Sequence, residues 1–129
     1  MSYPGLATHP FHARARASLA PHAARWISSL HPNPHGIPYG GMLSFTLASR
    51  AHAEAFLTST RLFVLAESLG GVESLAEHPA AMTHAGVPEE EREALGITEG
   101  LIRLSVGVED TDDLITDVAR ALDVVARLD

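Results

Sequence analysis

The 129-residue chain contains neither lysine nor cysteine, and these two absences limit its chemistry more than any other feature of its composition. Without cysteine there is no disulfide, no thiolate nucleophile and no cysteine-ligated zinc. Without lysine no side-chain ammonium can lose its proton and form an imine, because the guanidinium of arginine stays protonated. All nine basic side chains are arginines. A GC-rich genome would also produce this bias toward arginine, and under either explanation the chain has no side-chain amine that can form an imine.

Positive charge and long apolar runs are also scarce. The formal net charge is −7 with neutral histidines, and the arginines are scattered along the chain, so no basic surface is expected to attract phosphate backbones. No apolar run approaches the roughly 20 residues of a membrane span, and the N-terminus lacks a basic region followed by an apolar one. We therefore expect a soluble, cytoplasmic protein without nucleic-acid or membrane partners.

The chain does contain enough apolar sequence for one packed domain. Hydrophobic residues make up 46% of the chain and charged residues only 19%, a composition typical of globular proteins. Proline and histidine concentrate in residues 1–40, whereas residues 41–129 alternate strand-like and helix-like segments. These patterns predict an N-terminal arm at 1–40, with helices and a Pro/His-rich loop at 31–41, followed by an α+β domain at 41–129.

The periodicity of apolar residues predicts short strands alternating with helices. Strands are expected at 42–48, 62–66, 72–77 and 101–107. Helices are expected at 11–20, from Pro21 to Leu30, at 50–59, at 88–95 and at 109–128. Because several connections are too short for parallel crossovers, the expected fold class is α+β, a small, mainly antiparallel sheet with helices packed on one side.

The same periodicity predicts which side chains face the core. The expected inward positions are Ala53, Phe56 and Leu57 in the first domain helix, Ile102, Leu104 and Val106 in the last strand, and Leu114, Val118, Leu122 and Val125 in the last helix.

Arg103 is the candidate binding residue that this pattern singles out. It shares with Ser105 the face of the 101–107 strand that is turned away from the predicted core. Its planar guanidinium suits two-point recognition of a carboxylate. A surface arginine on an edge strand fits the same spacing.

The stretch Glu67-Ser68-Leu69-Gly70-Gly71 follows the predicted 62–66 strand. Glycine there permits positive φ or a close backbone approach, and strand ends commonly line binding sites. The alternative is a glycine hairpin with a solvated Glu67, which the local sequence alone favours.

Histidines and acids form no complete metal or catalytic motif. His9 and His12 are three residues apart, and His31 and His35 flank the Pro-rich loop, but no carboxylate completes either pair and no HExxH occurs. The acidic stretch 109–113 lacks the glycine and the spacing of an EF-hand and is typical of a helix N-terminus. There is no G-x-S-x-G motif either. We expect no metal and no catalytic residue on this chain.

Five strings in order carry a resemblance that spans nearly the whole chain. They are YPGLATHP (3–10), GGMLSF (40–45), TRLFVLAESLGGVESLAEHPAAMTHAGVP (60–88), LGI (95–97) and LIRLSVGVEDTDDL (101–114). In this order they resemble the C-terminal domain of the Cys/Met-metabolism family of pyridoxal-phosphate (PLP) enzymes. Within the family the likeness is greatest to the cystathionine γ-lyase group, in particular its fungal forms.

The resemblance implies a fold-type I enzyme in which a large domain binds PLP through a lysine and a small C-terminal domain closes over the substrate. It implies that Arg103 clamps the substrate α-carboxylate, with Ser68 and the Leu69 backbone beside it. Glu67 would lie at the mouth of the site and tune substrate and reaction preference. The implied reaction is γ-elimination of cystathionine to cysteine, 2-oxobutyrate and ammonia in transsulfuration, with a cystathionine γ-synthase-like activity as the alternative.

This chain differs from the family in two respects. It has no lysine, and it lacks the segments with which family members bind the cofactor. PLP cannot be bound covalently as an internal imine by this chain. We therefore expect a separate cofactor-binding large domain, or homologous full-length subunits, as partner, an amino acid as substrate, and an isolated chain that is inactive. The alternatives are a non-catalytic interaction module or truncated remnant and, more remotely, a metal-binding histidine protein.

Overall fold

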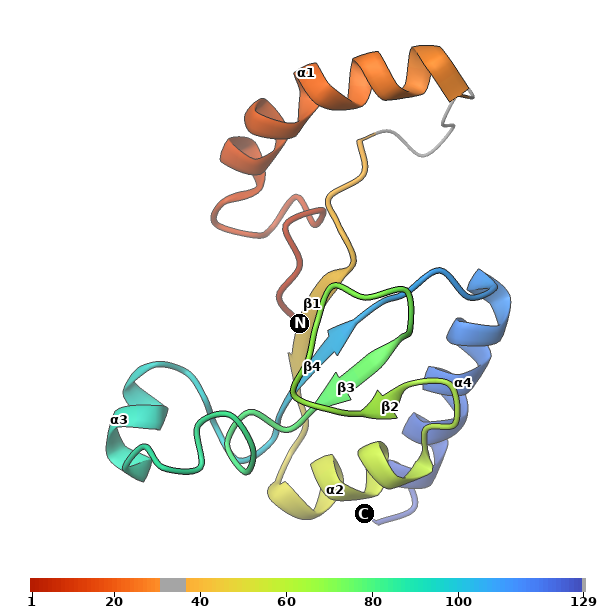
Figure 1. Ribbon diagram of the computed structural model, residues 1–129. Helices are drawn as coiled ribbons and strands as arrows, with labels where there is room; N and C mark the ends of the chain where they lie inside the picture. Colours follow the sequence, from red (N-terminus) through yellow and green to blue (C-terminus); the bar gives the residue numbers. More distant parts are fainter. Residues whose placement is uncertain (31–36, 129) are drawn as a thin grey trace. The chain divides into compact units, whose positions relative to one another are not determined.

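A computed structural model describes residues 1–30 and 37–128 (Figure 1). The chain divides into two compact units, one formed by Ser2–Gly40 and the other by Gly41–Asp129 together with Met1.

The first unit is built around one long helix, α1 (His12–Leu30). The predicted break at Pro21 is wrong, because the helix continues through this residue. Proline has a helix-compatible φ, but its missing N–H and the clash of its ring with the preceding turn cost about 3 kcal/mol, which the helix-favouring alanines around it help to offset. His12 donates from Nδ1 to the Pro4 carbonyl at 2.8 Å and stacks on Tyr39 at a ring distance of 5.2 Å. Most of the predicted 31–41 loop, residues 31–36, lies outside the described residues.

The second unit contains a four-stranded sheet in the order β1-β4-β3-β2. The strands are β1 (Met42–Thr46), β2 (Val64–Leu65), β3 (Leu75–Glu77) and β4 (Leu101–Ser105). β4 pairs antiparallel with both β1 and β3, whereas β2 pairs parallel with β3. The predicted fold class, a mainly antiparallel α+β arrangement, is confirmed.

The parallel pairing of β2 with β3 corrects the expectation of a glycine hairpin. Two strands joined by a hairpin run antiparallel, so the connection between them, residues 66–74, must instead return along the sheet before β3 begins. The predicted 62–66 strand is also reduced to two residues, Val64 and Leu65, whose side chains are exposed because β2 is an edge strand. We call residues 66–74 the β2–β3 loop (Figure 1).

Helices α2 (Arg50–Ser59) and α4 (Thr111–Val125) pack against each other and against the sheet, while α3 (Glu89–Ala94) has no buried residue. Ser49 caps α2 by accepting a hydrogen bond from the His52 amide. Asp110 caps α4 in the same way, accepting from the amides of Asp112 and Asp113. The acidic stretch is therefore a helix N-terminus, as the sequence predicts.

The hydrophobic core lies between these two helices and the sheet. Its buried members are Ala53, Phe56, Leu57, Phe63, Ala76, Ile102, Leu104, Leu114, Ala121 and Val125. The predicted inward face of α2 is confirmed, but that of α4 is partly wrong, because Leu122 is exposed. Leu114 and Val125 are buried as predicted and Val118 packs partly buried against the core, while Asp117 and Ala121 are buried positions that the pattern missed. The small side chain of Ala121 suits a position where two helices approach each other.

Among the helices in the described part of the chain, none is both long and apolar enough to cross a membrane.

Candidate functional site

The sheet has two faces of opposite character, set by the alternation of side chains along β4. Ile102 and Leu104 point into the core under α2 and α4, on what we call the helix face. Arg103 and Ser105 point the other way, and Glu77 of β3 stands directly opposite Arg103 in the antiparallel register. We call the side that carries Glu77, Arg103 and Ser105 the loop face.

Backbone atoms of the β2–β3 loop lie against the loop face. Arg103 donates from Nη2 to the carbonyl oxygens of Glu67 and Ser68, at 2.8 and 3.1 Å. Two residues on, the amide of Gly70 donates to Ser105 Oγ at 2.8 Å. Gly70 has φ +71°, a conformation that glycine adopts without strain. The Glu67–Gly70 segment therefore follows β4 from Arg103 to Ser105.

A second set of hydrogen bonds holds the far end of this loop. The carboxylate of Glu109 accepts from the Ser74 amide at 2.6 Å and from the Ser74 hydroxyl at 2.8 Å. The Gly107 amide in turn donates to Ser74 Oγ at 2.9 Å. A Cβ on Gly107 would stand 2.3 Å from the Val72 carbonyl oxygen, so this close approach requires glycine. Because these donors favour the charged form, they hold the pKa of Glu109 below its ordinary value.

Arg103 is the charged centre of the loop face. Its Nη1 lies 2.5 Å from Oε2 of Glu77, whose side chain is 1% exposed, whereas 21% of the Arg103 side chain is exposed. The guanidinium is thus held on one side by a buried carboxylate and on another by two carbonyls. Because part of the Arg103 side chain remains exposed, its positive charge is accessible to a further anion such as a carboxylate.

The other predicted site residues lie around Arg103 with their side chains turned to solvent. Glu67, Ser68 and Leu69 are all exposed, and it is the backbone carbonyls of Glu67 and Ser68, not their side chains, that contact the guanidinium. Leu69 is 55% exposed and follows directly in the same segment. The structure therefore places the four predicted residues in one region.

Sequence reasoning missed Glu77, the buried partner of Arg103. It lies in the string SLAEHP, within a run of seven buried residues from Ser74 to Ala80. An ionised side chain is rarely fully buried unless it is paired, so an acid in a segment recognised as buried would have been the signal. The periodic pattern hid it, because both faces of the short strand β3 are covered.

Sequence reasoning also missed Asp117, a buried residue of α4 with a structural role. Its carboxylate accepts from the amides of Arg61, Leu62 and Phe63, and it pairs with Arg120 one turn further along α4. Burial alone would raise the pKa of Asp117, but these hydrogen bonds, first those from Leu62 and Arg61, outweigh it and hold the pKa below its ordinary value. Asp117 thereby fixes the turn that leads into β2.

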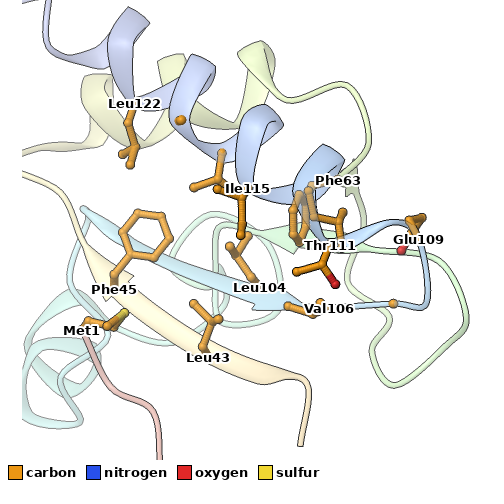
Figure 2. Close-up of a pocket in the computed structure, with 14 residues that line it drawn as sticks. Met1, Leu43, Phe45, Phe63, Leu104, Val106, Glu109, Thr111, Ile115 and Leu122 are labelled. Atoms are coloured by element: carbon orange, nitrogen blue, oxygen red, sulfur yellow. The ribbon is translucent and has the colours of Figure 1, made fainter. Parts of the chain in front are cut away.

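A separate groove of about 520 Å³ lies on the helix side, between α4 and the strands β1 and β4 (Figure 2). Leu43, Phe45, Leu104, Ile115 and Leu122 line it, with Glu109 and Thr111 at one end. Its nearly uniform apolar lining suits packing against another apolar surface and offers little to orient a polar amino acid.

A metal site is not formed by the described residues, in which no three His, Asp or Glu side chains come together. His9 and His12 make local hydrogen bonds to Ser2 and Pro4, while the other predicted pair, His31 and His35, lies outside the described residues. An aldehyde cofactor bound as an imine does not fit this chain either, because no residue is lysine. The arrangement can bind a carboxylate, but it cannot attach PLP through a side chain.

Comparisons with known proteins agree on one family. The family described as Cys/Met metabolism PLP-dependent enzyme matches residues 33–123. Cystathionine gamma-lyase of Saccharomyces cerevisiae is 48% identical over 123 residues, which is 95% of this chain and 27% of the relative. Cystathionine beta-lyase of Lactococcus lactis subsp. cremoris is 46% identical over 121 residues, 94% of this chain and 27% of the relative.

Solved structures give the same result. The crystal structure of cystathionine gamma-lyase from yeast superposes with a TM-score of 0.77 and 44% identity, covering 96% of this chain and 28% of that one. Cystathionine gamma synthase from Xanthomonas oryzae pv. oryzae, solved with aminoacrylate and cysteine, gives a TM-score of 0.74 and 42% identity, with 97% and 28% covered. The chain thus spans little more than a quarter of the length of these relatives. By the extent of these matches, it belongs to the Cys/Met-metabolism family of PLP-dependent enzymes.

Proposed function

We propose that this chain is the substrate-carboxylate-binding part of a cystathionine γ-lyase-like carbon–sulfur lyase that works with a PLP-binding large domain on another polypeptide segment. The observation that carries the proposal is the guanidinium of Arg103, fixed by Glu77 and by the carbonyls of Glu67 and Ser68 on the loop face. A guanidinium held in this way loses little side-chain entropy when it binds a carboxylate.

In this proposal each site residue has a distinct task. Arg103 binds the α-carboxylate of the amino-acid substrate, and Ser68 with the Leu69 backbone lines the adjoining wall. Glu67, which is exposed at the start of the segment, faces the distal part of the substrate and tunes the preference between substrates. PLP, when held by the large domain, supplies the electron sink that lets the carbon–sulfur bond break.

The reaction we propose converts cystathionine and water to cysteine, 2-oxobutyrate and ammonia. The identity to yeast cystathionine gamma-lyase supports this choice. The likeness to a cystathionine gamma synthase supports a synthase-like replacement at the same carbon as the alternative within the family.

A second candidate is a non-catalytic module or remnant that kept the fold and lost the chemistry. The absence of lysine favours it, because the chain cannot form the PLP imine. Incubation with PLP followed by borohydride reduction is expected to leave no pyridoxyl group on any side chain. A stable adduct on an internal residue, located by peptide mass spectrometry, would contradict both candidates.

A chimera distinguishes the two candidates. The C-terminal region of yeast cystathionine γ-lyase that matches this chain is replaced by the whole chain, and 2-oxobutyrate formation from cystathionine is measured. We expect turnover. A chimera that folds and binds PLP but forms no 2-oxobutyrate would favour the remnant.

Arg103→Ala in this chimera tests the clamp itself. Loss of a charge-assisted hydrogen bond to the substrate carboxylate is expected to raise KM for cystathionine about 30-fold or more. Arg50→Ala, which removes a guanidinium from the surface of α2, is the matched control and should leave KM unchanged. Equal KM values for Arg103→Ala and the parent chimera would refute the role of Arg103.

A further inference from the structure

We propose that Glu77 is the built-in counter-ion of Arg103 and that its charge sets how tightly the loop face binds a carboxylate. The inference rests on the proposed function, because it concerns the affinity of the same clamp. Glu77 would act through Arg103 without touching the substrate, as a positioning and affinity-setting residue.

The pair is fixed by the register of the sheet. Glu77 and Arg103 are directly opposite each other on β3 and β4, so both side chains project from the loop face at the same level. The Nη1–Oε2 distance of 2.5 Å makes this a close ion pair. Among the described residues, Arg103 is the only basic group paired with Glu77.

The contact is one of charge more than of directed hydrogen bonds. Neither carboxylate oxygen of Glu77 has an aligned hydrogen-bond partner among the described residues, and the buried Nε of Arg103 has none either. A buried carboxylate without hydrogen bonds depends on its counter-charge. Glu77→Gln keeps the shape of the side chain and removes its charge, and Glu77→Met removes the charge without bringing buried amide donors into the site.

The arrangement makes Arg103 a guanidinium that is already partly neutralised. A substrate carboxylate that binds its exposed edge has to share the positive charge with Glu77, and the two like charges repel each other. The two carboxylates contact the same guanidinium and are therefore close together. At the effective dielectric of a half-buried site, their repulsion is large enough to weaken binding about tenfold or more. Glu77 thus keeps the clamp weak enough to release a product that carries the same carboxylate.

The test is a titration of the whole chain, followed by the NMR signals of the Arg103 guanidinium and of the amides at 67–70. The probes are N-acetyl-L-methionine and N-acetyl-L-methioninamide, which differ only in the carboxylate. Glu77→Gln removes the charge and keeps the shape. Glu73→Gln, in the exposed part of the same loop, removes one charge without contacting Arg103 and is the matched control.

We expect Glu77→Gln to bind the carboxylate probe about tenfold more tightly than the parent chain, with the amide probe unaffected and Glu73→Gln within about twofold of the parent. The gain should vanish in Glu77→Gln/Arg103→Ala. Unchanged or weaker binding in Glu77→Gln would overturn the inference. If Glu77→Gln does not fold, Glu77→Met is measured against the same criteria. Equal binding by the parent chain and Arg103→Ala would instead contradict the proposed function, so the two failures are distinguishable.

Discussion

Side chains of β4 alternate between the helix face and the loop face of the sheet, and the two faces differ in what they contribute. On the helix face, Ile102 and Leu104 are buried under α2 and α4 and contribute stability in proportion to the apolar area removed from water. On the loop face, Arg103 pairs with Glu77 and donates to backbone carbonyls of the β2–β3 loop. Burying charges there contributes little to stability. Under the proposed function the loop face serves binding, so substitutions on the two faces should separate stability from ligand affinity.

The largest expected effect lies on the helix face. Ile102→Ala leaves a cavity at a fully buried position and should lower the free energy of unfolding by about 3 to 4 kcal/mol. Ile115→Ala, on the surface of α4 with 61% of the side chain exposed, is the control and should change it by no more than about 0.5 kcal/mol. Urea denaturation followed by circular dichroism measures both. Similar losses in the two variants would mean that the core is not where the structure places it.

The next effect concerns Asp117, the polar residue within the helix side. Asp117→Ala removes the acceptor of three backbone amides and the partner of Arg120, and should destabilise the chain by about 3 kcal/mol. Asp123→Ala, at an exposed position of the same helix, provides the comparison and should be nearly neutral. If both substitutions were neutral, the turn before β2 would not depend on this carboxylate.

The smallest effect is the pH dependence contributed by Glu109, which holds the β2–β3 loop to the end of β4. Its pKa is lowered in the folded chain, so its contribution is fully present above its unfolded pKa of about 4.3 and is lost as the pH falls through the lower folded pKa. The difference in unfolding free energy between the parent chain and Glu109→Gln should therefore shrink below about pH 4.3. Ser74→Ala, which removes one donor to Glu109, should show a reduced version of the same difference. A difference that is constant from pH 3 to 7 would contradict this assignment.

The helix face could be predicted from the sequence because it follows one repeating rule. Alternation placed Ile102 and Leu104 inward, and helical spacing placed Phe56 and Leu57 against them. The rule failed where a buried position holds a polar residue and where burial depends on contacts between segments that are distant in the sequence. Leu122 fits the helical stripe as well as Ala121 does, but Ala121 is fully buried and Leu122 is exposed.

The loop face was less accessible to such reasoning. Arg103 could be singled out because it interrupts an apolar strand, but its partner Glu77 is 26 residues away in sequence, and only the β3–β4 register brings the two together. The parallel pairing of β2 with β3 was hidden for the same reason, because the glycines of the 66–74 stretch are equally compatible with a hairpin. Local patterns specify faces and turns, whereas pairing between distant strands depends on the whole fold.

Mapping where a carboxylate binds on the folded chain tests the role of the loop face most directly. N-acetyl-L-methionine is titrated into the isotopically labelled chain, and amide shift changes are compared with those caused by N-acetyl-L-methioninamide. We expect the carboxylate-dependent changes to cluster on the loop face, at Arg103 and residues 67–70, and to disappear in Arg103→Ala. Changes that centre on the apolar groove beside α4, or that persist undiminished in Arg103→Ala, would contradict the assignment of the loop face as the binding site.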